Sequence, residues 1–222
     1  MKGRQILDSA FIASECLDNQ LKAGVPGVLC KLDIVKAYDH VNWKSLVFLF
    51  QQSGFSEKWR RWIRGCISTV KFSILINGSS SDFFGSSRGL RQGDPLSSFL
   101  FDIVMEAMSC MLVAATAAGQ FSGFTVGNVT SSLMKMSHLL FADDTLVFCD
   151  ADSNHITTLH GILSRFEEMS GLKINLGKFE LVPVGDVPNL LELVKILGCR
   201  ESALLLKYLG LPLGASFKDK TI

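Results

Sequence analysis

Two adjacent aspartates, Asp143 and Asp144, interrupt a run of strand-forming apolar residues in the segment LLFADDTLVFC at 139–149. An ionised carboxylate in apolar surroundings is costly unless it is paired, hydrogen-bonded or bound to a metal. Between Met136 and Arg165 the sequence contains no Lys or Arg that could pair with them. The counter-charge must therefore come from elsewhere in the chain or from a bound cation. A hairpin turn with two solvated carboxylates is the alternative, because Asp is common in turns.

A third aspartate, Asp33, lies near the end of the segment VLCKLDIV at 28–35, which is short and apolar like a buried strand. Asp33 and Asp143 each stand where a strand meets a turn, so each carboxylate can face solvent. If the two strands pair, the carboxylates meet, and two like charges in contact favour an intervening cation. Mg²⁺ prefers carboxylate oxygens, and two such ions roughly 3.5–4 Å apart assist phosphoryl transfer. Two unrelated turn aspartates are the alternative.

The carboxylates need strands to hold them, and the rest of the sequence predicts both helices and strands. Apolar spacing and end signals favour helices over 6–17, 38–54, 57–66, 95–115, 153–171 and 189–197. Strands or hairpins are expected over 28–35, 71–84, 136–149, 172–176, 179–184 and 207–215. The order of these elements predicts an α+β fold in which an antiparallel sheet has helices packed on one face.

Several single residues mark where these helices begin and end. We expect Asp39 to cap the helix over 38–54 and Gly54 to end it. Asp94 is expected to cap the long helix, with Pro95 at its first position. Asp102, inside that helix, is expected to be structural or solvent-facing rather than a metal ligand.

Composition limits the class of protein. A chain of 222 residues with 48% hydrophobic residues is expected to fold, around one sizeable core or as two small domains. The net charge of +1 lacks the basic balance of many nucleic-acid binders, so any such surface must be local. Six scattered cysteines without a C-x-x-C pair indicate reduced thiols in an intracellular protein and argue against a zinc site. The longest uncharged stretch, 107–134, is too interrupted for a membrane span, so we expect a soluble protein.

Four segments, KLDIVKAYDHVNW, RGLRQGDPLSS, FADD and SGLKINLGK, occur in the order of the palm motifs of reverse transcriptases. The residues of these motifs resemble those of the non-LTR (LINE-type) retrotransposon branch, and the resemblance covers nearly the whole chain. Each motif alone is weak, but together at fitting distances they are specific. The resemblance implies one polymerase domain fragment over 1–222. Its expected parts are partial fingers at 1–27, a polymerase palm at 28–200 with an inserted fingers hairpin at about 66–90, and a primer-grip-like hairpin with a truncated end at 201–222.

The resemblance assigns the catalytic carboxylates. Asp33, Asp143 and Asp144 match the residues that bind two Mg²⁺ ions, for which Mn²⁺ can substitute, and the main-chain carbonyl of Ile34 is a further expected ligand. Lys178 matches the basic residue proposed in related polymerases to protonate departing pyrophosphate. A solvated lysine is the alternative, since lysines are mostly exposed.

The resemblance also assigns nucleotide-binding residues. Tyr38 matches the aromatic steric gate that favours dNTPs, with a core aromatic as the alternative. Gln92 and Gly93 match the pair that contacts template and nucleotide, and Gly93 has no side chain where the backbone must lie close to the bases. Arg88 and Arg91 can meet phosphates electrostatically.

Two further segments carry competing interpretations. Tyr208, Leu209 and Gly210 resemble the hairpin that grips the primer end, and a buried edge hairpin is the alternative. The stretch KWRRWIR at 58–64 fits a nucleic-acid groove with tryptophans as stacking platforms. We favour instead an amphipathic helix with the tryptophans inward and a solvated basic face.

Two departures from the family pattern occur, Ser98 in place of a usual Pro and Phe179 in place of a usual Ser beside Lys178. Neither affects the carboxylates. The implied activity is that of an RNA-directed DNA polymerase (nucleotidyltransferase), which adds dNTPs to a primer 3′-OH. Whether this chain alone polymerises is left open, since the sequence KDKTI ends it abruptly and suggests a piece of a larger protein.

The expected partners are an RNA template, a DNA primer and dNTPs, without a membrane and with the oligomeric state open. An intracellular location is expected, and the resemblance implies the nucleus. The alternatives are a reverse transcriptase of the group II intron maturase type and a non-catalytic nucleic-acid-binding remnant of the same fold.

Overall fold

The computed structural model describes residues 6–127, 134–204 and 206–214. The chain forms two compact units. Unit 1 comprises residues 1–34, 108–165 and 174–222, and unit 2 comprises residues 35–107 and 166–173. The helices and strands of unit 1 are α1 (Ile6–Ala23), β1 (Gly27–Leu32), β6 (Phe124–Val126), β7 (Met134–Met136), β8 (His138–Phe141), β9 (Asp144–Asp150), β10 (Glu180–Val184), α7 (Leu190–Leu197), β11 (Arg200–Glu201), β12 (Lys207–Tyr208) and β13 (Leu211–Pro212). The boundary between the units falls within α5 (Pro95–Ala117) and α6 (Ser153–Ser170).

A five-stranded sheet forms the centre of unit 1, in the order β11-β10-β1-β9-β8. The first long strand, β1, lies in the middle and runs antiparallel to both β9 and β10. Strand β8 is antiparallel to β9, and only the short pair β10–β11 is parallel. The α+β fold with an antiparallel sheet is therefore confirmed, with one parallel pair at its edge.

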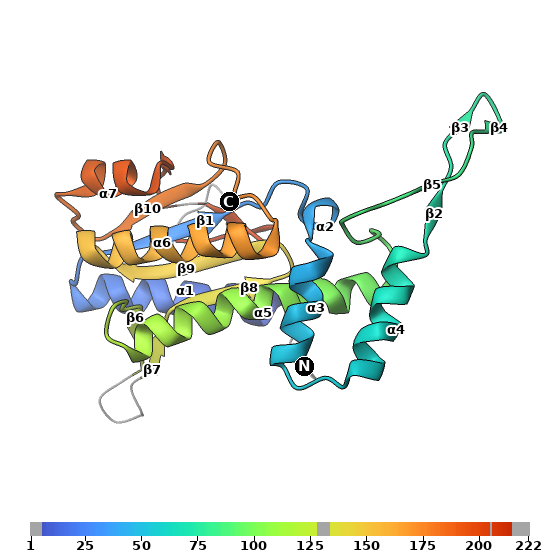
Figure 1. Cartoon of the computed structure of the whole chain (residues 1–222). Coiled ribbons are helices and arrows are strands. Elements are labelled where there is room, and N and C mark those ends of the chain that lie inside the picture. The colour runs from blue at the N-terminus through green and yellow to red at the C-terminus, as the bar shows by residue number, and fades with distance from the viewer. Residues whose placement is uncertain (1–5, 128–133, 205, 215–222) are drawn as a thin grey trace. The chain divides into compact units, whose positions relative to one another are not determined.

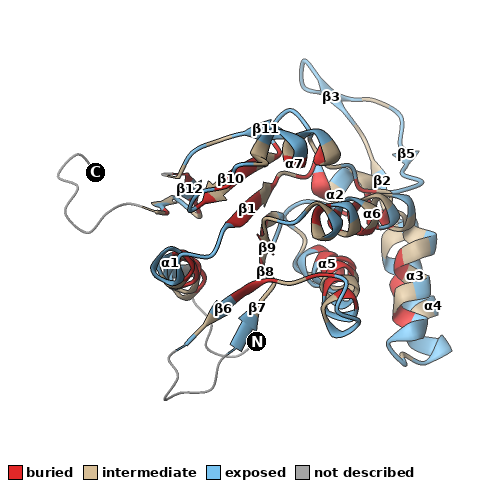
Figure 2. Cartoon of the chain, turned by 90° about the vertical axis from the view of Figure 1, so that its left-hand side faces the viewer, coloured by how far each residue is buried: buried red, intermediate tan, exposed pale blue. Residues whose placement is uncertain are grey.

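Helices cover both faces of this sheet. Consecutive residues of β1 and of β9 are buried, which requires a cover on each face because side chains alternate along a strand. Figures 1 and 2 show α1 on one face and α6 on the other. The arrangement expected from the sequence, with helices on one face, is thus incomplete.

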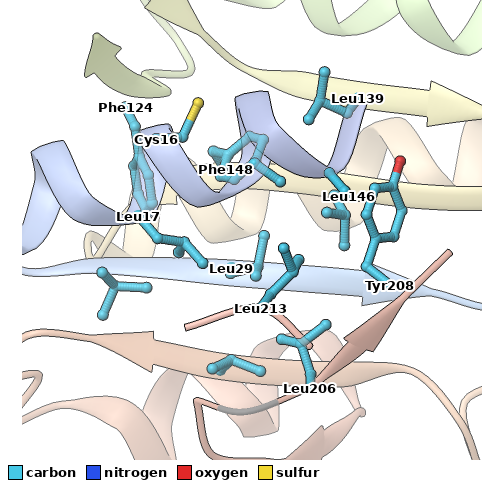
Figure 3. Close-up of a cluster of buried hydrophobic side chains, with 14 residues drawn as sticks. Cys16, Leu17, Leu29, Phe124, Leu139, Leu146, Phe148, Leu206, Tyr208 and Leu213 are labelled. Carbon is cyan, nitrogen blue, oxygen red and sulfur yellow. The ribbon is translucent and has the colours of Figure 1, made fainter. Parts of the chain in front are cut away.

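The core on the α1 face explains why the N-terminal segment is helical. Its apolar residues Ala10, Ala13, Cys16 and Leu17 recur at helical spacing and are all buried. They pack in one cluster with side chains from the sheet and from the C-terminal hairpin, as Figure 3 shows. The labelled members of the cluster are Cys16, Leu17, Leu29, Phe124, Leu139, Leu146, Phe148, Leu206, Tyr208 and Leu213.

Unit 2 contains α2 (Ala37–His40), α3 (Trp43–Gln52), α4 (Glu57–Ser68), β2 (Lys71–Phe72), β3 (Leu75–Ile76), β4 (Ser79–Ser80) and β5 (Phe84–Gly85). The single helix predicted over 38–54 is therefore two helices, and Asp39 lies inside the first instead of capping the pair. The cap of α3 is Asn42, whose Oδ1 accepts hydrogen bonds from the amides of Lys44 (2.9 Å) and Ser45 (3.4 Å). Asn and Asp cap about equally well, so residue preference alone does not favour Asp39 over Asn42.

Other end signals are confirmed. Asp94 Oδ1 accepts a hydrogen bond from the amide of Leu96 at 2.9 Å, and α5 begins at Pro95. The turn between β3 and β4 is Asn77–Gly78, with φ angles of 49° and 86°. Both positive values suit a two-residue hairpin turn, as the Asn-Gly pair predicted.

Of the two strands predicted over 172–176 and 179–184, only the second forms. The segment 179–184 forms β10, but the segment 172–176 makes only an isolated bridge between Ile174 and Ile34. The antiparallel pair β6–β7 was not predicted.

Helix α5 is, in the described part of the chain, the one helix long and apolar enough to cross a membrane. A core helix of a soluble protein meets the same criterion. The expectation that the protein has no membrane partner stays a prediction.

Candidate active site

The pairing of β1 with β9 brings two of the three aspartates together. The ladder between these strands ends at the pair Leu32–Thr145. One further step of the same register sets Asp33 opposite Asp144. Directly opposed residues of antiparallel strands project from the same face, with Cβ atoms about 4.5–5.5 Å apart. The condition set by the sequence, that the two strands pair, is therefore met.

The third aspartate, Asp143, lies in the turn that joins β8 to β9. This turn has two residues, Ala142 and Asp143, between the paired ends Phe141 and Asp144. Ala142 has φ 52°, an uncommon conformation for a residue with a Cβ atom. The tight turn keeps Asp143 exposed and directly beside Asp144.

The charges of the three aspartates act on one another. The pKa of Asp144 is raised, first by partial burial and then by the charge of Asp143, with a further contribution from Asp33. Lys31, on the neighbouring strand β1, opposes this rise. Negative charge therefore accumulates at the ends of β1 and β9, and a bound cation would relieve it.

Both carboxylate oxygens of Asp33 contact groups of the segment 174–178. The ammonium of Lys178 lies 3.6 Å from Oδ1, and the side-chain amide of Asn175 donates a hydrogen bond to Oδ2 at 3.1 Å. The backbone holds this segment in place, since the amide of Asn175 donates to the carbonyl of Asp33 at 2.8 Å. Lys178 thus supplies a counter-charge to Asp33. Its side chain is 69% exposed and that of Asp33 is 39% exposed, so water screens the pair.

Asn175 is a site residue that the sequence did not single out. It lies within the motif SGLKINLGK, but an amide carries no charge and gave no separate signal. Its position next to Asp33 depends on the bridge between Ile34 and Ile174, which joins distant parts of the chain.

The carboxylates suit a hard divalent cation, but they do not yet surround one. Within the described residues, no three His, Cys, Asp or Glu side chains are grouped so that they could hold a metal ion. The oxygens of Asp33 face Lys178 and Asn175 instead. The donor set of partly exposed carboxylates with mutual repulsion still fits Mg²⁺ chemically. Two backbone hydrogen bonds flank the bridge between Ile34 and Ile174, and on this side they use the carbonyl of Asp33 and the amide of Val35. The carbonyl of Ile34 takes part in neither of them.

Tyr38 is half-buried in unit 2, where its ring stacks on that of Phe101. The ring centroids are 4.8 Å apart and the ring planes meet at 20°. The backbone of Tyr38 also fixes the loop that precedes α5, because its carbonyl accepts a hydrogen bond from the amide of Leu90 at 2.7 Å. A steric gate needs a fixed ring, and the stacking supplies one, but the role of Tyr38 stays a prediction.

The loop at 91–93 is exposed and borders a cavity of about 380 Å³ in unit 2. Arg88, Arg91 and Gln92 are among the residues that line this cavity. Gly93 has φ 88°, a conformation that side chains disfavour, which explains the glycine directly before the cap of α5. The proposed contacts of Arg91, Gln92 and Gly93 with a nucleotide stay predictions.

The C-terminal hairpin β12–β13 is confirmed, but its tyrosine lies inside unit 1. Tyr208 is 1% exposed, and its hydroxyl has no hydrogen-bond partner among the described residues. Burial, followed by the charge of Asp144, raises the pKa of Tyr208 to about 12. The buried ring agrees with the alternative of a buried hairpin, and primer binding at Tyr208 stays a prediction. Leu209 and Gly210, with φ angles of 50° and 81°, form the turn and remain the candidate primer contacts.

Comparison with known proteins agrees with this geometry. Residues 1–213 match the family model described as reverse transcriptase (RNA-dependent DNA polymerase). A Pol polyprotein of the type-1 retrotransposable element R2 from Popillia japonica is 33% identical over 182 residues, which are 80% of this chain and 24% of that protein. The Pol polyprotein of the element R2DM from Drosophila melanogaster is 27% identical over 182 residues, covering 82% of this chain and 16% of that protein. The chain thus spans a quarter or less of the length of these relatives.

A solved structure supports the fold alone. Telomerase from Candida albicans, in complex with a fragment of telomeric RNA, superimposes with a TM-score of 0.60 at 19% identity. The match covers 81% of this chain and 30% of that one.

Proposed function

Because the chain belongs to the reverse transcriptase family, we propose that it forms the catalytic palm of the RNA-directed DNA polymerase of a LINE-type retrotransposon. The reaction is the addition of dNTPs to a primer 3′-OH on an RNA template. One observation carries the proposal. The β1–β9 ladder ends at the pair Leu32–Thr145, directly beside Asp33 and Asp144, and the adjoining turn adds Asp143.

The three aspartates would hold two Mg²⁺ ions, or Mn²⁺ in their place, with the carbonyl of Ile34 as a further ligand. Such ions neutralise charge on the attacking and leaving oxygens during phosphoryl transfer. In the structure Asp33 is paired with Lys178. To bind a cation, Asp33 must exchange the Lys178 ammonium for the metal.

Lys178 then becomes available to the reaction. Its side chain is largely exposed and long enough to turn away from Asp33 while it stays near the carboxylates. A protonated lysine there can give its proton to the departing pyrophosphate oxygen. Asn175 keeps its hydrogen bond to Asp33 and so orients the carboxylate during this exchange.

Further residues of the chain bind the other reactants in this proposal. Tyr38 excludes a ribose 2′-OH, the loop of Arg91, Gln92 and Gly93 contacts the nucleotide and template, and the Leu209–Gly210 turn contacts the primer. The RNA template, DNA primer and dNTPs are the partners, and the nucleus is the proposed compartment.

Primer extension on an RNA template with Mg²⁺ tests the proposal. We expect Asp143→Asn to lower extension about a hundredfold or more, since a metal centre supplies several kcal/mol of transition-state stabilisation. Asp102→Asn is the matched control, because Asp102 is an exposed aspartate of α5 outside the site. Binding of RNA and primer without any extension by the unaltered chain would favour a non-catalytic nucleic-acid-binding module.

A further inference from the structure

Helix α4 exposes two tryptophans, contrary to the inward orientation favoured from the sequence. Trp59 is 44% exposed and Trp62 is 56% exposed, whereas Ile63 is buried. Arg60 shares the inward side with Ile63, three residues before it in the helix, and its guanidinium donates a hydrogen bond to Gln51 Oε1 at 2.8 Å. Ile63 and the aliphatic part of Arg60 therefore face the core of unit 2, and both tryptophans lie at the surface.

The exposed rings are anchored to the core of unit 2. The ring centroids of Trp62 and Trp59 are 6.4 Å apart, and Trp59 lies 6.1 Å from Phe55. Phe55 in turn packs edge-on against Phe50 at 4.8 Å, and Phe50 is fully buried. Such a chain of ring contacts restricts the tryptophans, so a partner would lose little conformational entropy on docking.

Basic side chains accompany the tryptophans on α4. The Lys58 ammonium lies 4.9 Å from the centre of the Trp62 ring, in a cation–π contact. Arg61 and Arg64 are also exposed. In the described part of the chain, no ion pair engages any of these three cations. Their charges are therefore available to an anionic partner.

We propose that Lys58, Trp59, Arg61, Trp62 and Arg64 form a docking surface for single-stranded RNA, which we name the α4 platform. Unstacked bases lie on the indole rings, and the basic groups contact the phosphates. Aromatic rings beside basic side chains suit a single strand, whose bases are free to stack, whereas a duplex hides its base faces. An apolar protein partner would have to accept the Lys58 ammonium over the Trp62 ring and two further exposed cations on the same helix. The choice of RNA as the strand rests on the proposed function, in which RNA is the template.

Binding of a fluorescently labelled, unstructured RNA of about 12 nucleotides tests the platform by anisotropy. We expect Trp59→Ala with Trp62→Ala to weaken binding about tenfold or more, because each stacked base contributes measurably to affinity. RNA should also quench the tryptophan fluorescence of the unaltered chain. Phe48→Ala is the matched control, since Phe48 is an exposed aromatic on the neighbouring helix α3 and should leave binding unchanged.

A charge variant checks the phosphate contacts separately. Arg61→Gln with Arg64→Gln should lower the slope of log affinity against log salt by about 1.4 if both arginines meet phosphates of a single strand. Because all four substituted side chains are exposed, these variants are expected to fold, which denaturation can check.

Three results would overturn the α4 platform. The first is an unchanged RNA affinity in the double tryptophan variant, and the second is equally tight binding of a duplex of the same length. The third is that the unaltered chain associates with itself and the double tryptophan variant does not, since the tryptophans would then contact a second copy of the chain. A different result would contradict the proposed function: a chain that still binds RNA through α4 but shows no metal-dependent primer extension.

Discussion

Removing the hydroxyl of Tyr208 should make the protein more stable. The side chain is almost completely buried, and its hydroxyl has no partner among the described residues. A buried polar group left unpaired costs about 1–3 kcal/mol. Tyr208→Phe keeps the ring, which Figure 3 shows beside Leu146, and removes only the oxygen. We therefore expect the free energy of unfolding to rise by about 1–3 kcal/mol.

Urea denaturation at constant pH measures this change, which should appear as a higher midpoint with an unaltered slope. Ser170→Ala provides the contrast. The hydroxyl of Ser170 is buried but donates to the carbonyl of Phe166 at 2.6 Å and accepts from the amide of Leu172 at 3.1 Å. Its removal should cost about 1–3 kcal/mol, because a buried amide then loses its partner. If Tyr208→Phe destabilised the chain as Ser170→Ala does, the Tyr208 hydroxyl would have to be hydrogen-bonded, contrary to the structure.

Three further predictions concern backbone packing and charge. Gly123→Ala should lower the free energy of unfolding, measured by denaturation, by about 1–3 kcal/mol. The reason is that a Cβ atom at position 123 would lie 2.1 Å from the carbonyl oxygen of Met136. Gly161→Ala is the control, because a Cβ atom there meets open space and the change should be neutral or stabilising. Asp144→Asn should stabilise the metal-free chain at neutral pH, because the folded-state pKa of Asp144 is raised. The gain in the free energy of unfolding should be absent well below pH 3.8 and should grow as the pH rises through the range in which the carboxyl group ionises. Denaturation at a series of pH values that showed no such growth would contradict this prediction. Lys178→Gln should tighten Mn²⁺ binding about two- to fivefold, because it removes a competing cation whose ion pair with Asp33 contributes at most ~1 kcal/mol. The same change should slow primer extension. Weaker Mn²⁺ binding would argue against the exchange of the Lys178 ammonium for a metal ion at Asp33.

Features decided within a few residues could be predicted from the sequence. The Asn77–Gly78 turn, the Asp94 cap and the β8–β9 hairpin depend on local backbone preferences, and the structure confirms all three. The pairing of β1 with β9 could only be stated as a condition, because it joins segments more than 100 residues apart, and the structure shows that the condition is met.

Features decided by distant packing could not be predicted. The helix α4 has two apolar sides, and only the core of unit 2 determines that Ile63 rather than the tryptophans is buried. Asn175 reaches Asp33 through a bridge between segments far apart in the chain. Tyr208 shares a short hairpin with the turn at Leu209, and nothing in its local sequence shows that its ring enters the core cluster.

The central claim is that Asp33, Asp143 and Asp144 together hold divalent cations. Titration of the chain with Mn²⁺, followed by electron paramagnetic resonance, measures this directly and needs no substrate. We expect Mn²⁺ to bind the unaltered chain and the Asp102→Asn control equally, and the affinity to fall about tenfold or more in Asp33→Asn and in Asp143→Asn. The same affinity in all four proteins, or no binding by the unaltered chain, would contradict the claim.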